Sequence, residues 1–147
     1  MQFDDLYFMK QALLEAEKSI EKNEVPVGAV IVVNQKIIGR GHNLIENLKD
    51  VTAHAEMQAI TAASNFLNGK FLDECTLYVT LEPCTMCGGA LYLARISRVV
   101  IGAMDFKRGY SNLGINLHPK TKVSNGILAE ESERLLQDFF LKKRNKK

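Results

Sequence analysis

The sequence has few cysteines and no long apolar run, and its first ten residues do not have the pattern expected of a secretion signal. Its 147 residues include three cysteines, an odd number that does not suggest a disulfide framework. No stretch approaches the roughly 18 consecutive apolar residues of a membrane-spanning helix. The N-terminal segment MQFDDLYFMK has acidic residues where a secretion signal carries positive charge, and no apolar run follows it. These absences predict a cytoplasmic protein whose thiols stay reduced.

The chain also has little net charge, but its basic residues are unevenly distributed. A formal charge of +2 is too small to indicate a nucleic-acid partner by itself. The last seven residues, LKKRNKK, nevertheless hold five of the 19 lysines and arginines. Such a run can contact phosphates through charge alone, although a frayed, solvated tail is its simpler interpretation.

Neither an internal repeat, nor a low-complexity tract, nor a linker interrupts the chain. We therefore expect one domain over residues 1–147, with a basic tail from about 142 to 147. The apolar content of 46% and the charged content of 24% are ordinary for a globular protein of this length.

Hydrophobic periodicity predicts a chain of alternating helices and strands. The expected helices cover residues 5–22, 53–65, 84–94 and 127–143. The expected strands cover residues 25–33, 36–43, 76–81 and 98–103. Asp50 or Thr52 is expected to cap the second helix, and residues 105–123 are the least regular stretch. A hairpin followed by a βαβ unit gives a mixed sheet covered by helices, that is, a three-layer α/β/α sandwich.

Cys84 and Cys87 form a C-x-x-C pair, which structural zinc, thiol redox chemistry and coincidence can all produce. Pro83 suits the first turn of a helix, so both sulfurs are expected near the positive end of that helix. This position favours the thiolate, which is the form that binds metal. Thiol redox chemistry would use the same arrangement, so the cysteine pair alone does not distinguish metal binding from redox function.

His54 favours metal if it reaches the same place. It lies at the expected start of one helix as Cys84 does at another, and in α/β sheets ligands collect where helices begin after strands. One imidazole and two thiolates leave the fourth tetrahedral position of a zinc ion open, which is the pattern of a catalytic site. A buried, hydrogen-bonded histidine is the plain alternative.

Glu56 adds a proton acceptor to this group. Residues two apart do not share a face of a regular helix, but His54 can point along the axis from the first turn while Glu56 leans back toward it. A zinc ion lowers the pKa of water toward ~7, and a neighbouring carboxylate can take up and return the proton. A structural zinc site has no need of this glutamate, whose alternative role is surface solvation.

The two segments together match the H-x-E and P-C-x-x-C signature of zinc-dependent nucleobase deaminases. Further stretches carry a narrower likeness: EVPVGAVIV, TAHAE, TLYVTLEPCTMC and DFFLKKR. With these stretches the chain resembles the bacterial tRNA-specific adenosine deaminases from about residue 3 to 144.

The resemblance implies a cytidine-deaminase-like fold with a five-stranded mixed sheet. It also implies a homodimer whose interface helps to shape the RNA site, and conversion of the wobble adenosine of an arginine tRNA to inosine. His54, Cys84 and Cys87 would hold one zinc ion per subunit, and Glu56 would shuttle protons.

The same resemblance implies substrate contacts. Asn43 and the backbone amide of Ala55 would hold the flipped base, and Asp105 would contact the neighbouring ribose. One departure concerns the segment NLHPKTKVSNGIL, which is shorter than is common in the family and lacks an Asn-His pair. This departure bears on the RNA contacts of the loop at about residues 105–125.

The resemblance also implies an anticodon-loop surface lined by Phe140, Lys143 and Arg144. These residues help to decide between the tRNA function and its alternatives. A deaminase of free bases or nucleosides, of the cytosine or guanine type, has the same core motif, but a free base offers no phosphates for this basic helix to contact. A thiol oxidoreductase is a second rival. A non-catalytic zinc module is a third, and its fourth ligand would come from one of three residues: His42, Cys75 or His118.

Overall fold

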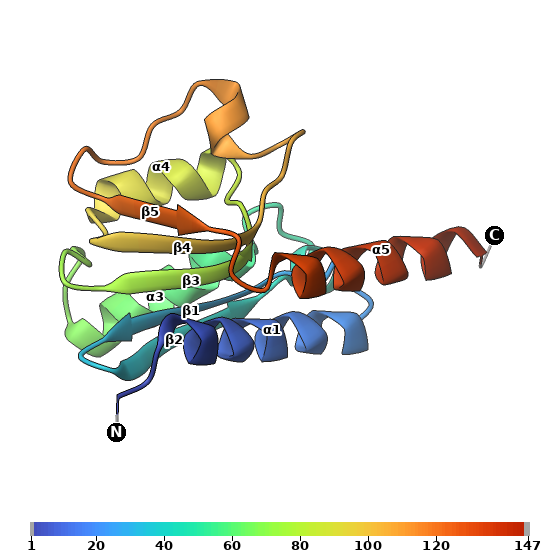
Figure 1. The fold of residues 1–147 in the computed structure, drawn as a ribbon, viewed down its shortest axis with the longest axis horizontal. Coiled ribbons are helices and arrows are strands. Elements are labelled where there is room, and N and C mark those ends of the chain that lie inside the picture. The colour runs from blue at the N-terminus through green and yellow to red at the C-terminus, as the bar shows by residue number, and fades with distance from the viewer. Residues whose placement is uncertain (1, 146–147) are drawn as a thin grey trace.

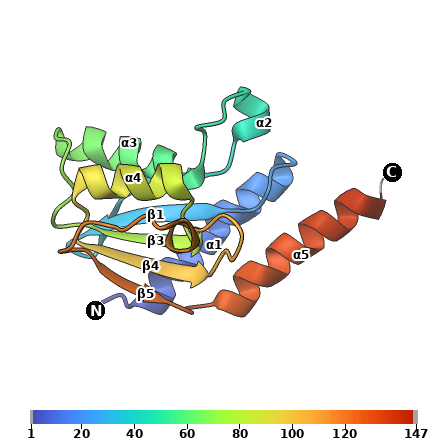
Figure 2. The same ribbon diagram turned by 90° about the horizontal axis from the view of Figure 1, so that it is seen from above.

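The computed structural model describes residues 2–145, which form a five-stranded mixed sheet between two layers of helices (Figures 1 and 2). The strands are β1 (Gly28–Val33), β2 (Lys36–His42), β3 (Thr76–Leu81), β4 (Arg98–Ala103) and β5 (Lys122–Asn125). The helices are α1 (Asp5–Glu21), α2 (Ile45–Leu48), α3 (Ala55–Leu67), α4 (Thr85–Ala94) and α5 (Ala129–Asn145), with a 3₁₀ turn at Tyr110–Leu113. The predicted α/β/α sandwich is confirmed. Residues 146 and 147 of the expected basic tail lie outside the described residues.

The sheet order is β2-β1-β3-β4-β5. β1 pairs antiparallel with both β2 and β3, whereas β3, β4 and β5 run parallel. The β3–α4–β4 segment is therefore the expected βαβ unit. This topology places the carboxyl ends of β3 and β4 at the same edge as the N-termini of α3 and α4.

The two faces of the sheet bury separate clusters of apolar side chains. One cluster joins the alanine face of α3 and part of α4 to the sheet, through Ala55, Ala59, Leu91, Leu77 and Val79. The other joins α1 to the opposite face, and α5 covers that same face (Figure 2). Across residues 2–145, none of the helices has the length and apolar character needed to cross a membrane.

The start of α3 differs from the prediction. The helix begins at Ala55, and His54 occupies the N-cap position in an extended conformation without a side-chain cap. The carboxylate of Asp50 is engaged earlier in the loop, where it accepts hydrogen bonds from the backbone N–H and hydroxyl of Thr52 at 2.8 and 2.7 Å. Neither Asp50 nor Thr52 therefore caps α3. Freed from the helix, the His54 imidazole can turn toward the neighbouring helix.

Two elements were not located from the sequence. The short helix α2 follows β2, and β5 overlaps the end of the stretch that was expected to be irregular and extends two residues beyond it. β5 has four residues, most of them exposed, so it lacks the alternating apolar pattern that marks a half-buried strand.

Gly41 on β2 allows α3 to lie directly against the strand. A Cβ atom at this position would overlap the carbonyl oxygen of Ala55 and press on the side chain of Gln58. The first turn of α3 is thus fixed by contact with the sheet, and its position sets the positions of His54 and Glu56.

Candidate active site

The ligand atoms of His54, Cys84 and Cys87 lie together at the starts of α3 and α4. His54 Nδ1 is 3.6 Å from the sulfur of Cys84 and 3.6 Å from that of Cys87. All three candidate ligand atoms lie within 4.8 Å of one another. Like His54, Cys84 is an N-cap residue with extended backbone, and Cys87 is buried in the first turn of α4.

These distances fit a tetrahedral metal ion. With zinc–nitrogen and zinc–sulfur bonds of ordinary length, the nitrogen–sulfur edge of a tetrahedron is about 3.6 Å. One nitrogen and two sulfurs form a donor set that suits zinc, and three protein ligands leave one position for water or substrate. Within residues 2–145, no fourth His, Cys, Asp or Glu joins this group.

The electrostatics of the site favour a thiolate. Hydrogen bonding from Cys87, and then from His54, lowers the pKa of Cys84 to about 3 against the opposing effect of burial. Hydrogen bonding with Cys84 raises the pKa of His54. Both residues cap helices whose N-terminal N–H groups present positive charge, which adds to the attraction for an anionic sulfur.

Glu56 lies in the first turn of α3 beside this group and is only 4% exposed. Burial raises the pKa of its carboxyl group to about 7, because interactions with its own backbone N–H, with His54 and with Cys87 do not compensate for lost hydration. Since His54 is the cap residue and not part of the helix, the two-residue spacing does not separate their side chains.

A second buried glutamate, Glu82, organises the loop after β4. Its carboxylate accepts a hydrogen bond from the backbone N–H of Asp105 at 3.1 Å. It also accepts hydrogen bonds from the backbone N–H of Ser111, at 3.1 Å, and from the Ser111 hydroxyl. Gly109 packs so closely that a Cβ atom there would overlap the Glu82 carboxylate. Glu82 was not among the residues predicted to be functional, although its place between the end of a strand and Pro83 was a signal for it.

A third buried glutamate, Glu24, organises the loop after β2. Its carboxylate accepts from the backbone N–H groups of Glu46 and Asn47, at 3.1 and 2.7 Å, and from the Asn47 side chain at 2.7 Å. Burial alone would raise its pKa, but these hydrogen bonds lower it. This loop carries Asn43, which is 7% exposed.

The Asn43 amide is partly engaged within its own loop. Its nitrogen donates to the carbonyl of Val25 at 3.2 Å, and its oxygen accepts from the backbone N–H of Ile45 at 3.3 Å. One amide hydrogen and one oxygen lone pair remain for a substrate. Ala55 is the first residue of α3, so its N–H has no acceptor within the helix and points from the helix N-terminus.

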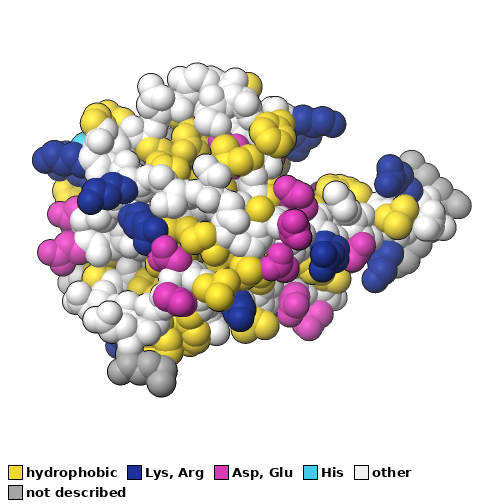
Figure 3. Space-filling view, viewed as in Figure 1, with side chains coloured by type: hydrophobic (Ala, Val, Ile, Leu, Met, Phe, Trp, Pro, Cys, Tyr) yellow, Lys and Arg dark blue, Asp and Glu magenta, His cyan; other side chains and the backbone are white. Residues whose placement is uncertain are grey.

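The other predicted substrate residues lie on two separate elements. Asp105 is half-buried in the Glu82-bound loop, and its carboxylate accepts from the backbone N–H groups of Lys107 and Arg108 at 3.1 and 3.0 Å. Phe140, Lys143 and Arg144 are exposed on α5, which projects beyond the body of the molecule (Figure 1). Lys and Arg side chains gather at its projecting end (Figure 3). Lys143 also contributes to the lowered pKa of Glu24.

The residues considered as a fourth ligand are engaged elsewhere. His42 Nδ1 is 3.3 Å from the buried carboxylate of Glu15, and Cys75 is fully buried in the core beneath α3 and α4. His118 accepts a hydrogen bond from the backbone N–H of Lys120 at 3.1 Å.

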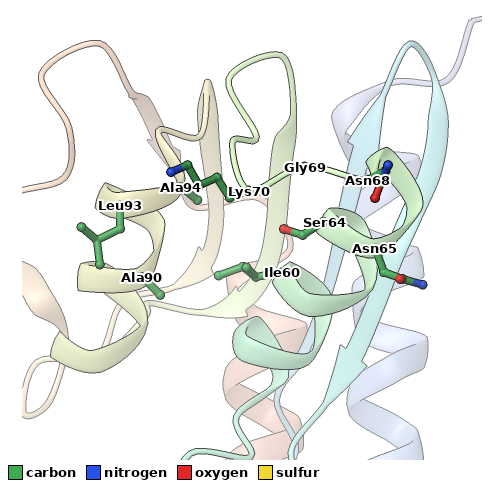
Figure 4. Close-up of a pocket in the computed structure, with 9 residues that line it drawn as sticks. All are labelled: Ile60, Ser64, Asn65, Asn68, Gly69, Lys70, Ala90, Leu93 and Ala94. Carbon is green, nitrogen blue, oxygen red and sulfur yellow. The ribbon is translucent and has the colours of Figure 1, made fainter.

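An open groove lies between α3 and α4, away from the ligand atoms (Figure 4). Ile60, Ala90 and Leu93 supply its apolar wall, and Lys70 lies at its far end. The groove runs along the C-terminal halves of both helices, whereas the ligand atoms lie at their N-termini. It is therefore a separate surface and not the substrate cavity.

The chain is similar to known deaminases over nearly its whole length. The family model of the MafB19-like deaminases matches residues 3–144. The tRNA-specific adenosine deaminase of Aquifex aeolicus is 48% identical over 144 residues, covering 95% of each chain. That of Bacillus subtilis is 47% identical, covering 98% of this chain and 92% of the relative. A solved structure from a study of A-to-I editing by tRNA:A34 deaminases matches with a TM-score of 0.80 and 42% identity, covering 88% of this chain and 98% of the other.

Proposed function

This chain belongs to the MafB19-like deaminase family and, within it, to the tRNA-specific adenosine deaminases, and from that premise we propose that it converts the wobble adenosine of a tRNA anticodon to inosine. The observation that carries the proposal is the joint position of His54, Cys84 and Cys87 at tetrahedral spacing beside the buried Glu56. An arginine tRNA is the proposed substrate, and the cytoplasm is the proposed compartment.

His54, Cys84 and Cys87 would hold one zinc ion, as their donor types and spacing fit. Zinc bound there would lower the pKa of water and so supply a nucleophile at neutral pH. The three ligands come from two helix starts that are packed against one sheet. Their relative positions are therefore set by the fold before metal binds, which reduces the cost of ordering the site.

Glu56 would move the protons of the hydrolysis. Its carboxylate takes a proton from the attacking water and delivers it to the ring nitrogen next to C6 of adenine. The water oxygen bonds to C6. The remaining proton of that new hydroxyl group passes through the same carboxylate to the amino nitrogen, the C6–N bond breaks as the C6 carbonyl forms, and ammonia leaves. The balance is adenosine plus water giving inosine plus ammonia. Burial of Glu56 keeps bulk water from competing for these protons.

Three groups would position the base and its neighbours. The remaining amide hydrogen and lone pair of Asn43 would face the polar edge of the flipped base, and the Ala55 N–H would donate to it. Asp105 would contact the adjacent ribose. Single-stranded anticodon bases are cheaper to extrude than paired ones, which suits a loop substrate.

The exposed residues of α5 would extend the contact along the anticodon loop. Phe140 is 46% exposed and can stack on a base, while Lys143 and Arg144 can approach phosphates. This surface distinguishes an RNA substrate from a free base, which has no phosphates.

A second copy of the chain is the proposed partner at the groove between α3 and α4. Leu93, on the groove wall, is 74% exposed, and the neighbouring Tyr92 is 44% exposed, a combination more typical of an interface than of a solvated helix. Light scattering should give a dimer mass for the wild type and a monomer mass for Leu93→Glu.

Deamination of an anticodon stem-loop tests the proposal directly. The purified protein should carry about one zinc per chain and produce inosine at the wobble position, whereas free adenine, cytosine and guanine should remain unchanged. Removing the metal with a chelator should abolish turnover, and adding zinc back should restore it. Activity on free bases alone would overturn the RNA assignment, and a protein that is folded and active without metal would overturn the site.

A further inference from the structure

Phe106 is an exposed aromatic side chain beside the candidate active site. It is 82% exposed, although burying a phenylalanine is normally favourable by a few kcal/mol. Its neighbours are Asp105, which the family resemblance places at the substrate, and the exposed Lys107 and Arg108. An aromatic ring followed by two cations is a typical composition for a single-stranded nucleic-acid contact.

The backbone that carries Phe106 is held at both ends. On one side, the N–H of Asp105 donates to Glu82, and the carboxylate of Asp105 accepts from the N–H groups of Lys107 and Arg108. On the other side, the N–H of Tyr110 donates to the carbonyl of Pro83 at 2.9 Å. The exposure of Phe106 is thus built into an ordered turn, so little ordering entropy would be lost when a ligand binds.

The same turn is attached to the metal-ligand segment. Cys84 forms an isolated antiparallel bridge with Gly109, and Glu82 and Pro83, which anchor the turn, directly precede Cys84. Phe106 therefore lies three residues from a position that is paired with a candidate ligand. In Figure 1 the segment leaving β4 rises past the edge of the sheet at which α4 begins.

We propose that Phe106 is a stacking platform for a nucleobase adjacent to the reacting adenosine, with Lys107 and Arg108 facing the phosphates of that nucleotide. This inference rests on the proposed RNA substrate and adds a contact to it. The flipped adenosine leaves its neighbours without a stacking partner on one side, and an exposed ring at the rim replaces that partner. Base–aromatic stacking tolerates any base, so the contact adds affinity without selecting sequence.

Kinetics of Phe106→Ala and Phe106→Tyr on a wobble-adenosine stem-loop test the proposal. The alanine variant should raise KM roughly 10-fold to 100-fold with kcat nearly unchanged, because stacking stabilises bound substrate and transition state alike. The tyrosine variant should retain wild-type KM. Phe66→Ala is the matched control: this ring is 53% exposed at the opposite end of α3, and its removal should leave KM unchanged.

Stem-loops with an abasic nucleotide on the 5′ or the 3′ side of the adenosine identify the stacked base. On one of them, the wild type and Phe106→Ala should have the same KM, because the base that Phe106 contacts is absent. In addition, 2-aminopurine placed at that position should lose fluorescence on binding the wild type and keep it on binding Phe106→Ala.

Three results would overturn the inference. The first is an unchanged KM for Phe106→Ala on the intact stem-loop, and the second is a KM for Phe106→Ala that exceeds the wild-type KM by the same factor on both abasic stem-loops. The third is a rise in KM that is explained by dissociation of a dimer, as measured by light scattering. Failure of the proposed function is distinguishable, since the wild type itself would then produce no inosine from the intact stem-loop.

Discussion

Glu56 and Glu82 are equally buried, at 4% and 3% exposure, yet their surroundings differ. The Glu82 carboxylate accepts hydrogen bonds from two backbone N–H groups and one hydroxyl, all from the loop after β4. Around Glu56, such donors do not offset burial, and its pKa rises to about 7. Burial of a carboxylate therefore does not identify its role. A carboxylate whose oxygens accept several hydrogen bonds stabilises the loop that donates them. A carboxylate beside a metal-ligand group whose burial is not offset by such donors is available to move protons.

The largest expected effect follows from Glu56→Ala. Deamination should fall by roughly 10²-fold to 10⁴-fold, the usual contribution of a general acid–base group. The melting temperature should stay near that of the wild type, because the backbone N–H that loses its partner is that of residue 56 itself, in the first turn of α3. Zinc content should be unchanged. An inosine assay, metal analysis and a thermal melt measure the three quantities. Glu56→Gln is the isosteric control and should be equally inactive, so wild-type turnover in either variant would contradict the proton role.

Glu82→Ala, in contrast to Glu56→Ala, should mainly reduce stability and substrate binding. The N–H groups of Asp105 and Ser111 would lose their acceptor, and the free energy of unfolding should fall by about 3 kcal/mol. Looser loop geometry should raise KM for the stem-loop while zinc stays bound. Urea unfolding and steady-state kinetics measure both effects. Glu82→Gln keeps one acceptor oxygen, so its free energy of unfolding should fall by less. If Glu82→Ala had the stability and the KM of the wild type, the loop would not depend on this carboxylate.

A smaller effect is expected from Gly109→Ala, which fills the space occupied by the Glu82 carboxylate. The clash should cost about 1–3 kcal/mol of unfolding free energy. The added Cβ overlaps both the Glu82 carboxylate and the carbonyl oxygen of Asp105. The Glu82 part of the cost should disappear when alanine already replaces Glu82, and a double-mutant cycle measures that coupling. Gly89→Ala is the matched control, since no heavy atom lies within 4 Å of its added Cβ. Equal costs at both glycines would remove Glu82 from the explanation.

The smallest effect concerns Asp5, a partly exposed carboxylate that extends the comparison to an ion pair. The hydrogen bond from Arg98 holds its pKa below the ordinary value of 3.8. A lowered folded-state pKa contributes stability above the unfolded pKa and loses it as the pH falls through the folded value. The difference in unfolding free energy between wild type and Asp5→Asn should therefore be constant above about pH 5 and shrink below about pH 4. Denaturant titrations across this range would show a flat difference if the ion pair contributes nothing.

The sequence predicted the family, the sandwich and the convergence of His54, Cys84 and Cys87, because motif spacing and hydrophobic periodicity are local signals. Their roles as ligands, and that of Glu56, stay predictions. The prediction that Asp50 or Thr52 caps α3 was wrong, since His54 itself occupies the N-cap position and the Asp50 side chain accepts a hydrogen bond from Thr52 within the loop.

The structural glutamates could not be found by the same means. Glu82 and Glu24 bind backbone groups more than 20 positions away in the chain, and no local pattern announces such a partner. β5 was missed because its four residues are largely exposed and make their hydrogen bonds to β4 alone.

The contact of Gly41 with the first turn of α3 has a consequence for engineering. Any larger residue at position 41 would displace the backbone that carries His54 and Glu56. Position 41 is therefore a poor choice for a mutagenesis library at the candidate active site. Diversity introduced to accept new nucleic acids is better placed in the exposed 106–108 turn. There, side chains can be exchanged without displacing the reaction centre.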